Sequence, residues 1–118
     1  MHDQVLSIPQ CEELVALGID TSNASMCWAK CAKINSNKEW ESYWHLELNE
    51  ESHGTKVPTF TLQDILEMLP KPCYINCIDD AFYQCEITTE NGSTTTNGSS
   101  PLKAAFEMLK SCKQNNKI

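Results

Sequence analysis

The sequence predicts a single α+β domain in which an antiparallel sheet carries its helices mainly on one face. A length of 118 residues is the ordinary size of one domain. Apolar residues recur at helical spacing in some segments and at every second position in others, and no linker divides the chain. We expect the order α-β-β-α-β-β-(β)-α over residues 1–118, with residues 1–6 and 114–118 frayed.

The first helix is predicted by its end signals. Ser7 is a suitable N-cap, and Gln10 three residues later completes a capping box. Gly18 supplies the left-handed residue that commonly ends a helix. Between these ends Cys11, Leu14 and Val15 form an apolar stripe, with Leu17 as a further candidate. The helix is short, so packing must hold it.

A hairpin is predicted next, with strands over residues 26–34 and 40–48 joined by an Asn-Ser-Asn-Lys turn. The second strand alternates clearly, as a half-buried antiparallel strand does. One face carries Trp40, Ser42, Trp44, Leu46 and Leu48, and the other carries Glu41, Tyr43, His45 and Glu47.

Residues 49–59 are predicted to form a loop before a second helix. Thr61 is its expected cap, and Asp64 lies near the positive end of its dipole. Leu62, Ile65, Leu66 and Leu69 form the buried stripe, and Pro70 and Pro72 end the helix.

The last third of the chain predicts more strands and a final helix. Strands are expected over residues 73–78 and 81–89. Residues 90–99 are a polar turn or, after the Asn91-Gly92 hairpin signal, contain a short strand over 93–96. Ser100 is the expected cap of the final helix, and Pro101 suits its first turn.

Composition and charge exclude some classes of function. The chain has 9 basic and 16 acidic residues, a net charge of −7, and no basic run, so nucleic-acid binding is not expected. No apolar stretch approaches the ~18 residues of a membrane span, and no signal-like segment begins the chain. We therefore expect a cytoplasmic protein without membrane contact, whose cysteines stay reduced.

The seven cysteines are interpreted as small core side chains rather than as a metal or redox site. Cys27 and Cys31 are four residues apart in one predicted strand, as are Cys73 and Cys77. Positions four apart in a strand stand roughly 13 Å from each other, too far to share one ion. Cys85 shares a face with apolar neighbours. We predict no metal ligand and no cofactor.

No catalytic residue is predicted. His2 is terminal, His53 lies in a loop beside acidic residues, and His45 faces outward on a strand near Glu47. A histidine beside a carboxylate could serve as a base or a metal ligand, but exposed histidines usually do neither. The chain contains no nucleotide-binding, metalloprotease or serine-hydrolase motif. The sequence therefore offers no positive evidence for an enzyme.

Aromatic residues concentrate on the predicted hairpin, at Trp28, Trp40, Tyr43 and Trp44. Trp40 and Trp44 share the apolar face with Leu46 and Leu48, which favours the core. If the sheet is covered on one side only, Trp28, Trp40 or Tyr43 would be exposed and could anchor a partner. These four residues form the candidate interaction surface.

Three segments carry a resemblance to a known group of proteins. Residues 14–28, 57–70 and 100–109 resemble the opening, centre and close of a diffuse family of small uncharacterised phage, prophage and mobile-element proteins of gut Bacteroides-type bacteria. Ala24-Ser25-Met26 departs from the family's Ala-Asp-Met. The resemblance covers nearly the whole chain and implies a phage or mobile-element setting. It implies no known activity and transfers no site residues.

These observations favour a non-enzymatic accessory protein that binds a host or phage protein through its acidic, aromatic-bearing hairpin. Two alternatives stay open. An antitoxin-like or nucleic-acid-associated regulator would need at least three basic residues on one face. A thiol- or zinc-dependent protein would need several Cys and His side chains to converge.

Overall fold

The computed structural model describes residues 4–118 and confirms the α+β class. Within these residues, three α-helices and six strands follow one another along the chain. Their bounds are α1 Ile8–Ala16, β1 Met26–Ile34, β2 Trp40–Leu48, β3 Lys56–Thr59, α2 Leu62–Met68, β4 Cys73–Asp79, β5 Phe82–Thr89, β6 Gly92–Gly98 and α3 Pro101–Gln114. A short 3₁₀ turn, η2, spans Asn49–Glu51.

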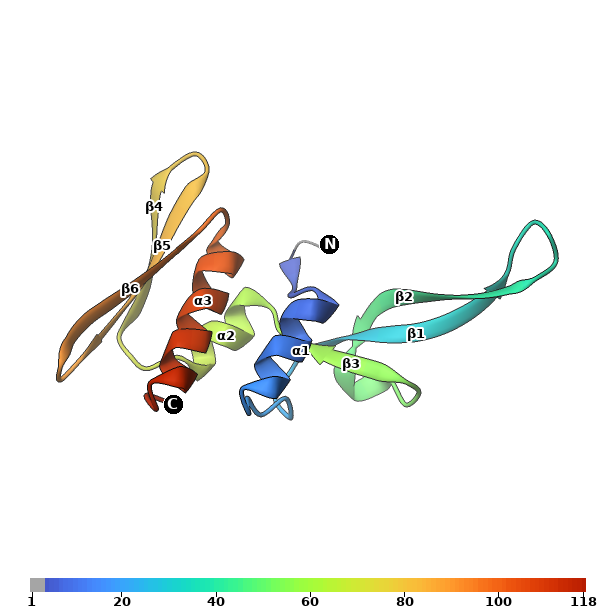
Figure 1. The fold of residues 1–118 in the computed structure, drawn as a ribbon, viewed down its shortest axis with the longest axis horizontal. Helices are drawn as coiled ribbons and strands as arrows, with labels where there is room; N and C mark the ends of the chain where they lie inside the picture. Colours follow the sequence, from blue (N-terminus) through green and yellow to red (C-terminus); the bar gives the residue numbers. More distant parts are fainter. Residues whose placement is uncertain (1–3) are drawn as a thin grey trace.

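The strands form two separate antiparallel sheets, with the orders β2-β1-β3 and β4-β5-β6. Figure 1 shows α3 lying against the second sheet at one end of the molecule, and β1 and β2 projecting at the other. We expected one sheet rather than two. The short helix α2 lies between β3 and β4 in the chain, and β3 pairs with β1 instead of continuing toward the second sheet.

The projecting part of β1 and β2 is called the arm here and comprises residues 30–44. β3 pairs only with the first four residues of β1, from Met26 to Ala29. Beyond that point β1 and β2 continue as a two-stranded ribbon that no helix covers (Figure 1). The arm makes the molecule long, with extents of 59 × 31 × 21 Å.

The core lies between the three helices, β3 and β5. Its fully buried members include the following side chains: Leu6, Cys11, Leu14, Phe60, Ile65, Cys85, Ile87, Ala104, Ala105, Met108 and Leu109. No residue of the arm belongs to this cluster. Apolar burial therefore stabilises the body, while the arm depends on its own ladder of hydrogen bonds.

The chain before α1 is part of the core, although we predicted a frayed end. Leu6 is fully buried, and Val5 forms an isolated bridge with Thr61. The Leu6 carbonyl oxygen accepts hydrogen bonds from Trp28 Nε1 and Thr59 Oγ1, both at 2.8 Å. These bonds satisfy a buried carbonyl and join the segment to β1 and β3. The predicted fraying of residues 1–3 lies outside the described residues.

The predicted helix ends are confirmed. Ser7 and Gln10 form the capping box of α1, and Gly18 follows the helix with a φ of 89°. Thr61 and Asp64 form a second capping box at α2. Ser100 caps α3 and is followed by Pro101.

The prediction that residues 49–59 form a loop throughout is wrong, because they contain β3, whereas the strand left open after the Asn91-Gly92 signal is present. β3 lies inside the predicted loop 49–59; it is four residues long, contains Pro58 and sits at a sheet edge, where a missing N–H is tolerated. β6 spans the whole polar stretch from Gly92 to Gly98. Its Thr96 Oγ1 donates to the Ala104 carbonyl oxygen at 2.8 Å, which ties the strand to α3. Among the described helices, none is long and apolar enough to cross a lipid bilayer.

Candidate functional site

The register of the β1–β2 hairpin sorts its side chains onto two faces. Ile34 pairs with Trp40, Lys30 with Trp44, and Trp28 with Leu46, and directly opposed residues point to the same side. This side is called the aromatic face. The opposite side is called the polar face, and its members along the ladder are Cys27, Ala29, Cys31, Lys33, Glu41, Tyr43, His45 and Glu47.

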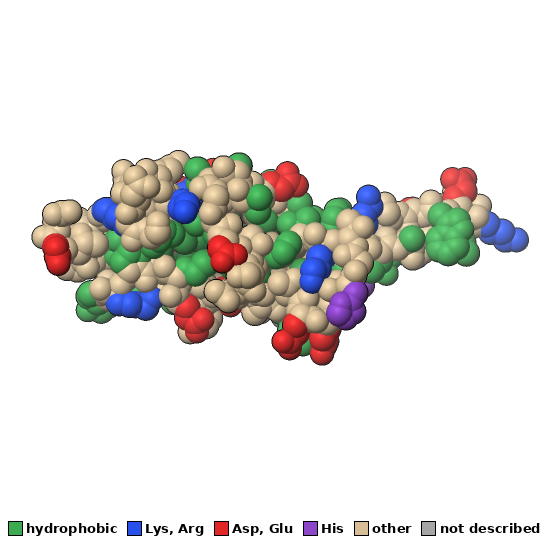
Figure 2. Space-filling view, turned by 90° about the horizontal axis from the view of Figure 1, so that it is seen from below, with side chains coloured by type: hydrophobic (Ala, Val, Ile, Leu, Met, Phe, Trp, Pro, Cys, Tyr) green, Lys and Arg blue, Asp and Glu red, His purple; other side chains and the backbone are tan. Residues whose placement is uncertain are grey.

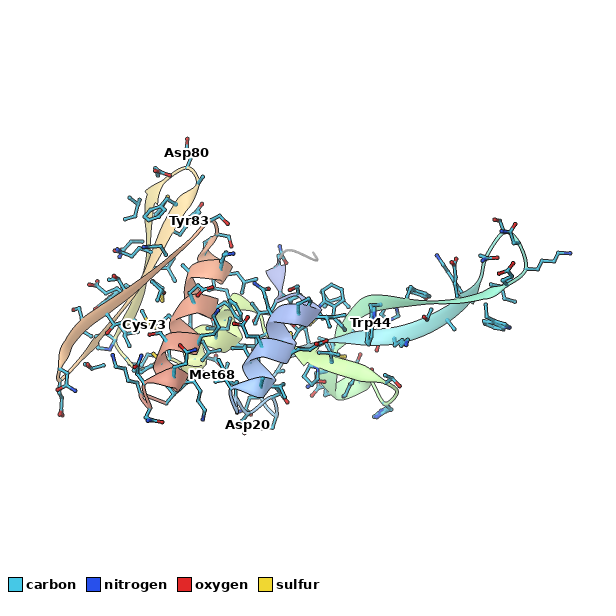
Figure 3. All side chains as sticks on the ribbon, in the orientation of Figure 1. Asp20, Trp44, Met68, Cys73, Asp80 and Tyr83 are labelled. Atoms are coloured by element: carbon cyan, nitrogen blue, oxygen red, sulfur yellow. The ribbon has the colours of Figure 1, made fainter. Side chains whose placement is uncertain are left out.

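Aromatic side chains of the arm are exposed. Trp40 is 72% exposed, and Trp44 and Tyr43 are 37% and 38% exposed. The prediction that Trp40 and Trp44 belong to the core is therefore wrong. The alternation placed both on an apolar face correctly, but no helix or further strand covers that face along the arm (Figure 3, where Trp44 is labelled).

Trp28 differs from the other three residues of the candidate interaction surface. It is only 9% exposed, and its indole N–H donates to the Leu6 carbonyl oxygen. β3 and the segment before α1 reach this part of β1 but not the arm. Trp28 therefore holds the base of the hairpin to the body, and the exposed aromatic residues lie farther out.

Lysines of β1 stack on two of the exposed rings. Lys30 Nζ lies 5.9 Å from the Trp44 ring centroid, and Lys33 Nζ lies 5.3 Å from that of Tyr43. Such cation–π contacts contribute about 0.5–1 kcal/mol at exposed sites. They orient the rings on the strand without burying them.

The free edge of the hairpin is acidic. β2 is an outer strand of its sheet, so the backbone groups on its far side have no strand partner. Between residues 39 and 55 every charged side chain is a glutamate, histidine aside: Glu39, Glu41, Glu47, Glu50 and Glu51. The first lysine after Lys38 is Lys56. An unpaired strand edge, exposed aromatic rings and negative charge thus coincide on β2.

A second feature lies on the polar face where the arm meets the body. Cys31 Sγ lies 3.5 Å from His45 Nδ1 and 3.6 Å from Nε2, and His45 Nε2 lies 2.5 Å from Glu47 Oε1. One ligand-type atom from each residue falls within 4.8 Å of the others. All three side chains are partly buried.

The Glu47 carboxylate accepts hydrogen bonds from the side chains of two neighbours, His45 and Ser52. The hydrogen bond to His45 lowers the pKa of Glu47, and a hydrogen bond from Ser52 adds to the effect, with Lys56 as a weaker contributor. Lys56 Nζ itself donates to the carbonyl oxygens of Asn49 and Ser52. A cavity of about 320 Å³ opens beside the cluster, and Glu51 and His53 lie on its wall with Cys31 and Glu47.

This cluster was not predicted from the sequence, because it forms between the two strands of the hairpin and not along either strand. His45 and Glu47 are two residues apart and share a face of β2. Cys31 pairs with Tyr43 and is therefore the diagonal neighbour of His45. The register from the Asn35–Lys38 turn was the signal that could have placed Cys31 there.

The remaining cysteines mostly pack as predicted. Cys11, Cys27, Cys85 and Cys112 are buried, and burial raises the pKa values of Cys11 and Cys112 and that of Cys85 to about 12. Cys73 is half-buried. Cys77 is exposed, so its assignment to the core is wrong; the tip of the β4–β5 hairpin extends beyond the part of the sheet that α3 covers (Figure 1).

The lysines do not form one continuous patch on the face drawn in Figure 2, where acidic side chains lie between them. Lys110 of α3 is ion-paired with Glu13 at 3.0 Å and with Glu107 at 3.4 Å. Lys117 Nζ donates to Thr94 Oγ1 at 2.9 Å. This arrangement gives a phosphate backbone little to bind on that face.

No protein-family model, curated protein or solved structure matches this chain. Among the described residues, the candidate functional features are the arm and the Cys31–His45–Glu47 cluster at its base.

Proposed function

We propose that this chain is a non-enzymatic accessory protein of the phage or mobile-element type, which binds another protein in the cytoplasm through its arm. The partner contributes an extended segment that carries basic and apolar side chains and adds to the free edge of β2. The single observation that carries this proposal is the exposure of Trp40, Tyr43 and Trp44 on an uncovered ribbon. The phage-type setting rests on the sequence resemblance.

The geometry of the arm supports an added strand rather than a flat contact. An edge strand presents a row of unpaired N–H and C=O groups, which an extended peptide can pair with. Trp40 and Trp44 stand on one face of β2 and Tyr43 on the other, so both faces of an added strand would meet aromatic surface. Large aromatic side chains are the usual anchors of protein interfaces.

Charge supports a basic partner. The strand and turn from residue 39 to residue 51 carry five glutamates and no lysine, within a chain of net charge −7. Like charges directly across a strand pair are unfavourable, whereas opposite charges stabilise it. An acidic edge therefore selects a segment with lysine or arginine and disfavours a second acidic strand, including a β2 strand of another copy.

The test uses a synthetic peptide that alternates lysine with valine, and a control peptide with glutamate in place of lysine. We expect the basic peptide to bind, to slow amide exchange along β2 and to bind more weakly at high salt. Trp40→Ser and Trp44→Ser together should weaken binding at least tenfold. Glu39→Lys with Glu41→Lys should weaken it as well. The matched controls are Tyr74→Ser, at an aromatic residue 53% exposed on β4, and Glu90→Lys.

A shortened arm provides a stability control. Replacing residues 32–42 by Asn-Gly joins the paired residues Cys31 and Tyr43 through a tight turn. Because no core residue is removed, the melting temperature should change by only a few degrees, while peptide binding should be lost. Equal binding by the full and shortened chains, or by the arm variants and their controls, would refute the proposal.

A further inference from the structure

The Cys31–His45–Glu47 cluster brings together one thiol, one imidazole and one carboxylate from two strands. These are the three ligand types that zinc takes in proteins, with metal–ligand distances of about 2.0–2.3 Å. Mixed sulfur and nitrogen donors favour zinc or cobalt over magnesium or calcium, which prefer all-oxygen sites. The donor set therefore selects a divalent transition metal.

The three side chains can reach one ion without a change in the backbone. In a tetrahedral site the sulfur and nitrogen ligands stand about 3.6 Å apart and the nitrogen and oxygen ligands about 3.4 Å. Cys31 Sγ already lies 3.5 and 3.6 Å from the two ring nitrogens. His45 must turn so that one nitrogen faces the sulfur, and Glu47 must withdraw by about 1 Å. Both side chains are more than one-third exposed, which leaves room for these rotations.

The surroundings favour a cation over a reactive thiolate. A sulfur almost equidistant from both ring nitrogens lies along the in-plane lone pair of neither, so it is not aligned for proton transfer to the imidazole. Catalytic cysteines are typically found in positive surroundings. Here Glu47 touches the histidine, and the wall of the adjoining cavity carries two carboxylates, Glu47 and Glu51, against one lysine, Lys30.

We propose that Cys31, His45 and Glu47 bind one Zn²⁺ ion at the base of the arm, with the fourth position open to the adjoining cavity. The site lies just past the end of the pairing between β3 and β1: the last paired residue of β1 is Ala29, and Cys31 is two residues farther along. A metal there would link β1 to β2 at the point where the ribbon leaves the body. The ligands lie on the polar face, so the aromatic face stays free.

The test titrates the reduced, metal-free full chain with Zn²⁺ in competition with a chromophoric chelator, and with Co²⁺ as a spectroscopic probe. We expect one ion per chain, and a thiolate-to-cobalt charge-transfer band with the visible bands of a four-coordinate ion. Cys31→Ser and His45→Gln should each weaken Zn²⁺ binding at least tenfold. Cys77→Ser is the matched control, because Cys77 is an exposed cysteine in the other sheet.

Alkylation gives a readout that does not depend on spectra. Zn²⁺ should slow the modification of Cys31 by iodoacetamide, measured by peptide mass, and should leave the rate at Cys77 unchanged. The proposal fails if the chain binds no ion at micromolar Zn²⁺, or if Cys31→Ser and His45→Gln bind as tightly as the unmodified sequence. It also fails if Zn²⁺ protects Cys77 and Cys31 equally.

Discussion

At the scale of single residues, the contact between β6 and α3 depends on a missing side chain. A Cβ atom at Gly98 would lie 2.5 Å from the Ala104 backbone nitrogen and 2.9 Å from the Lys103 carbonyl carbon. These are backbone atoms at the start of a helix, so they cannot move aside as the end of a side chain can. Gly98 therefore permits the close approach that lets Thr96 bond to α3.

We predict that Gly98→Ala destabilises the fold by about 1–3 kcal/mol, as overpacking of a tight contact usually does. Urea denaturation followed by circular dichroism measures the change in the free energy of unfolding. Gly54→Ala is the matched control, because a Cβ there meets no atom within 4 Å. Equal stability of the two variants would show that the helix shifts at no cost.

The sequence correctly predicted the roles of residues whose interactions are local. Ser7, Thr61 and Ser100 cap helices through bonds to residues three positions away, so their roles are visible in the sequence. The burial of Trp40 depends on whether another element covers its strand. Period-two alternation carries no information on that point, and the prediction was wrong.

At the scale of elements, Asp64 joins helix α2 to the chain that leads into β1. Its carboxylate accepts hydrogen bonds from the Thr61 backbone N–H at 3.0 Å, and from the Ser25 N–H and Oγ at 3.2 and 2.7 Å. The sequence predicted Thr61 as the cap and Asp64 near the positive end of the helix dipole, and the capping box between them is a finding of the structure. The bonds to Ser25 span 39 residues and stabilise the junction of two elements.

Asp64→Ala should therefore lower the free energy of unfolding by about 2 kcal/mol or more. The loss of an ordinary cap lowers it by only ~1 kcal/mol. Thermal unfolding gives the measurement. The double variant with Ser25→Ala should be less destabilised than the sum of the two single variants, because both remove the same bond. Gln63→Ala, at the neighbouring exposed position, is the control and should be nearly neutral. If the losses of stability from Asp64→Ala and Ser25→Ala add fully in the double variant, the bond between Asp64 and Ser25 does not stabilise the fold.

Pairing between distant strands limited the prediction of elements. The bounds of β1 and β2 could be predicted from alternation and from one turn. β3 could not, because four residues with a proline have no clear period, and they form a strand only by pairing with β1. The division into two sheets also depends on which distant strands pair, and such pairing produces no pattern in the local sequence.

At the scale of the whole molecule, three buried thiols make the stability of the core depend on alkaline pH. Burial raises the pKa of Cys85 to about 12 and also raises the pKa values of Cys11 and Cys112 from their ordinary value of 9.0. The unfolded chain releases these protons from about pH 9, whereas the folded chain releases each of them only at a higher pH. The unfolded state is then favoured, and stability falls as the pH rises from about 9 toward 12.

We predict that the free energy of unfolding falls as the pH rises above about 9, with a limiting slope of about 1.4 kcal/mol per pH unit from Cys85 and a further contribution from Cys11 and Cys112. Urea denaturation under reducing conditions at several pH values gives the slope. Cys85→Ala should show a gentler slope, whatever its absolute stability. Cys77→Ser, which changes an exposed thiol, should keep the slope of the unmodified chain. Parallel curves for Cys85→Ala and the unmodified chain would contradict the prediction.

The uncovered ribbon of residues 30–44 has a consequence for inheritance. In most of a small protein a mutation is selected against if it impairs either folding or function, because many residues contribute to both. Along the arm, selection on folding is weak, since no side chain of residues 30–44 belongs to the hydrophobic core. We therefore expect amino-acid substitutions to accumulate faster in the arm than in the body, at a rate set by the surface that the arm binds.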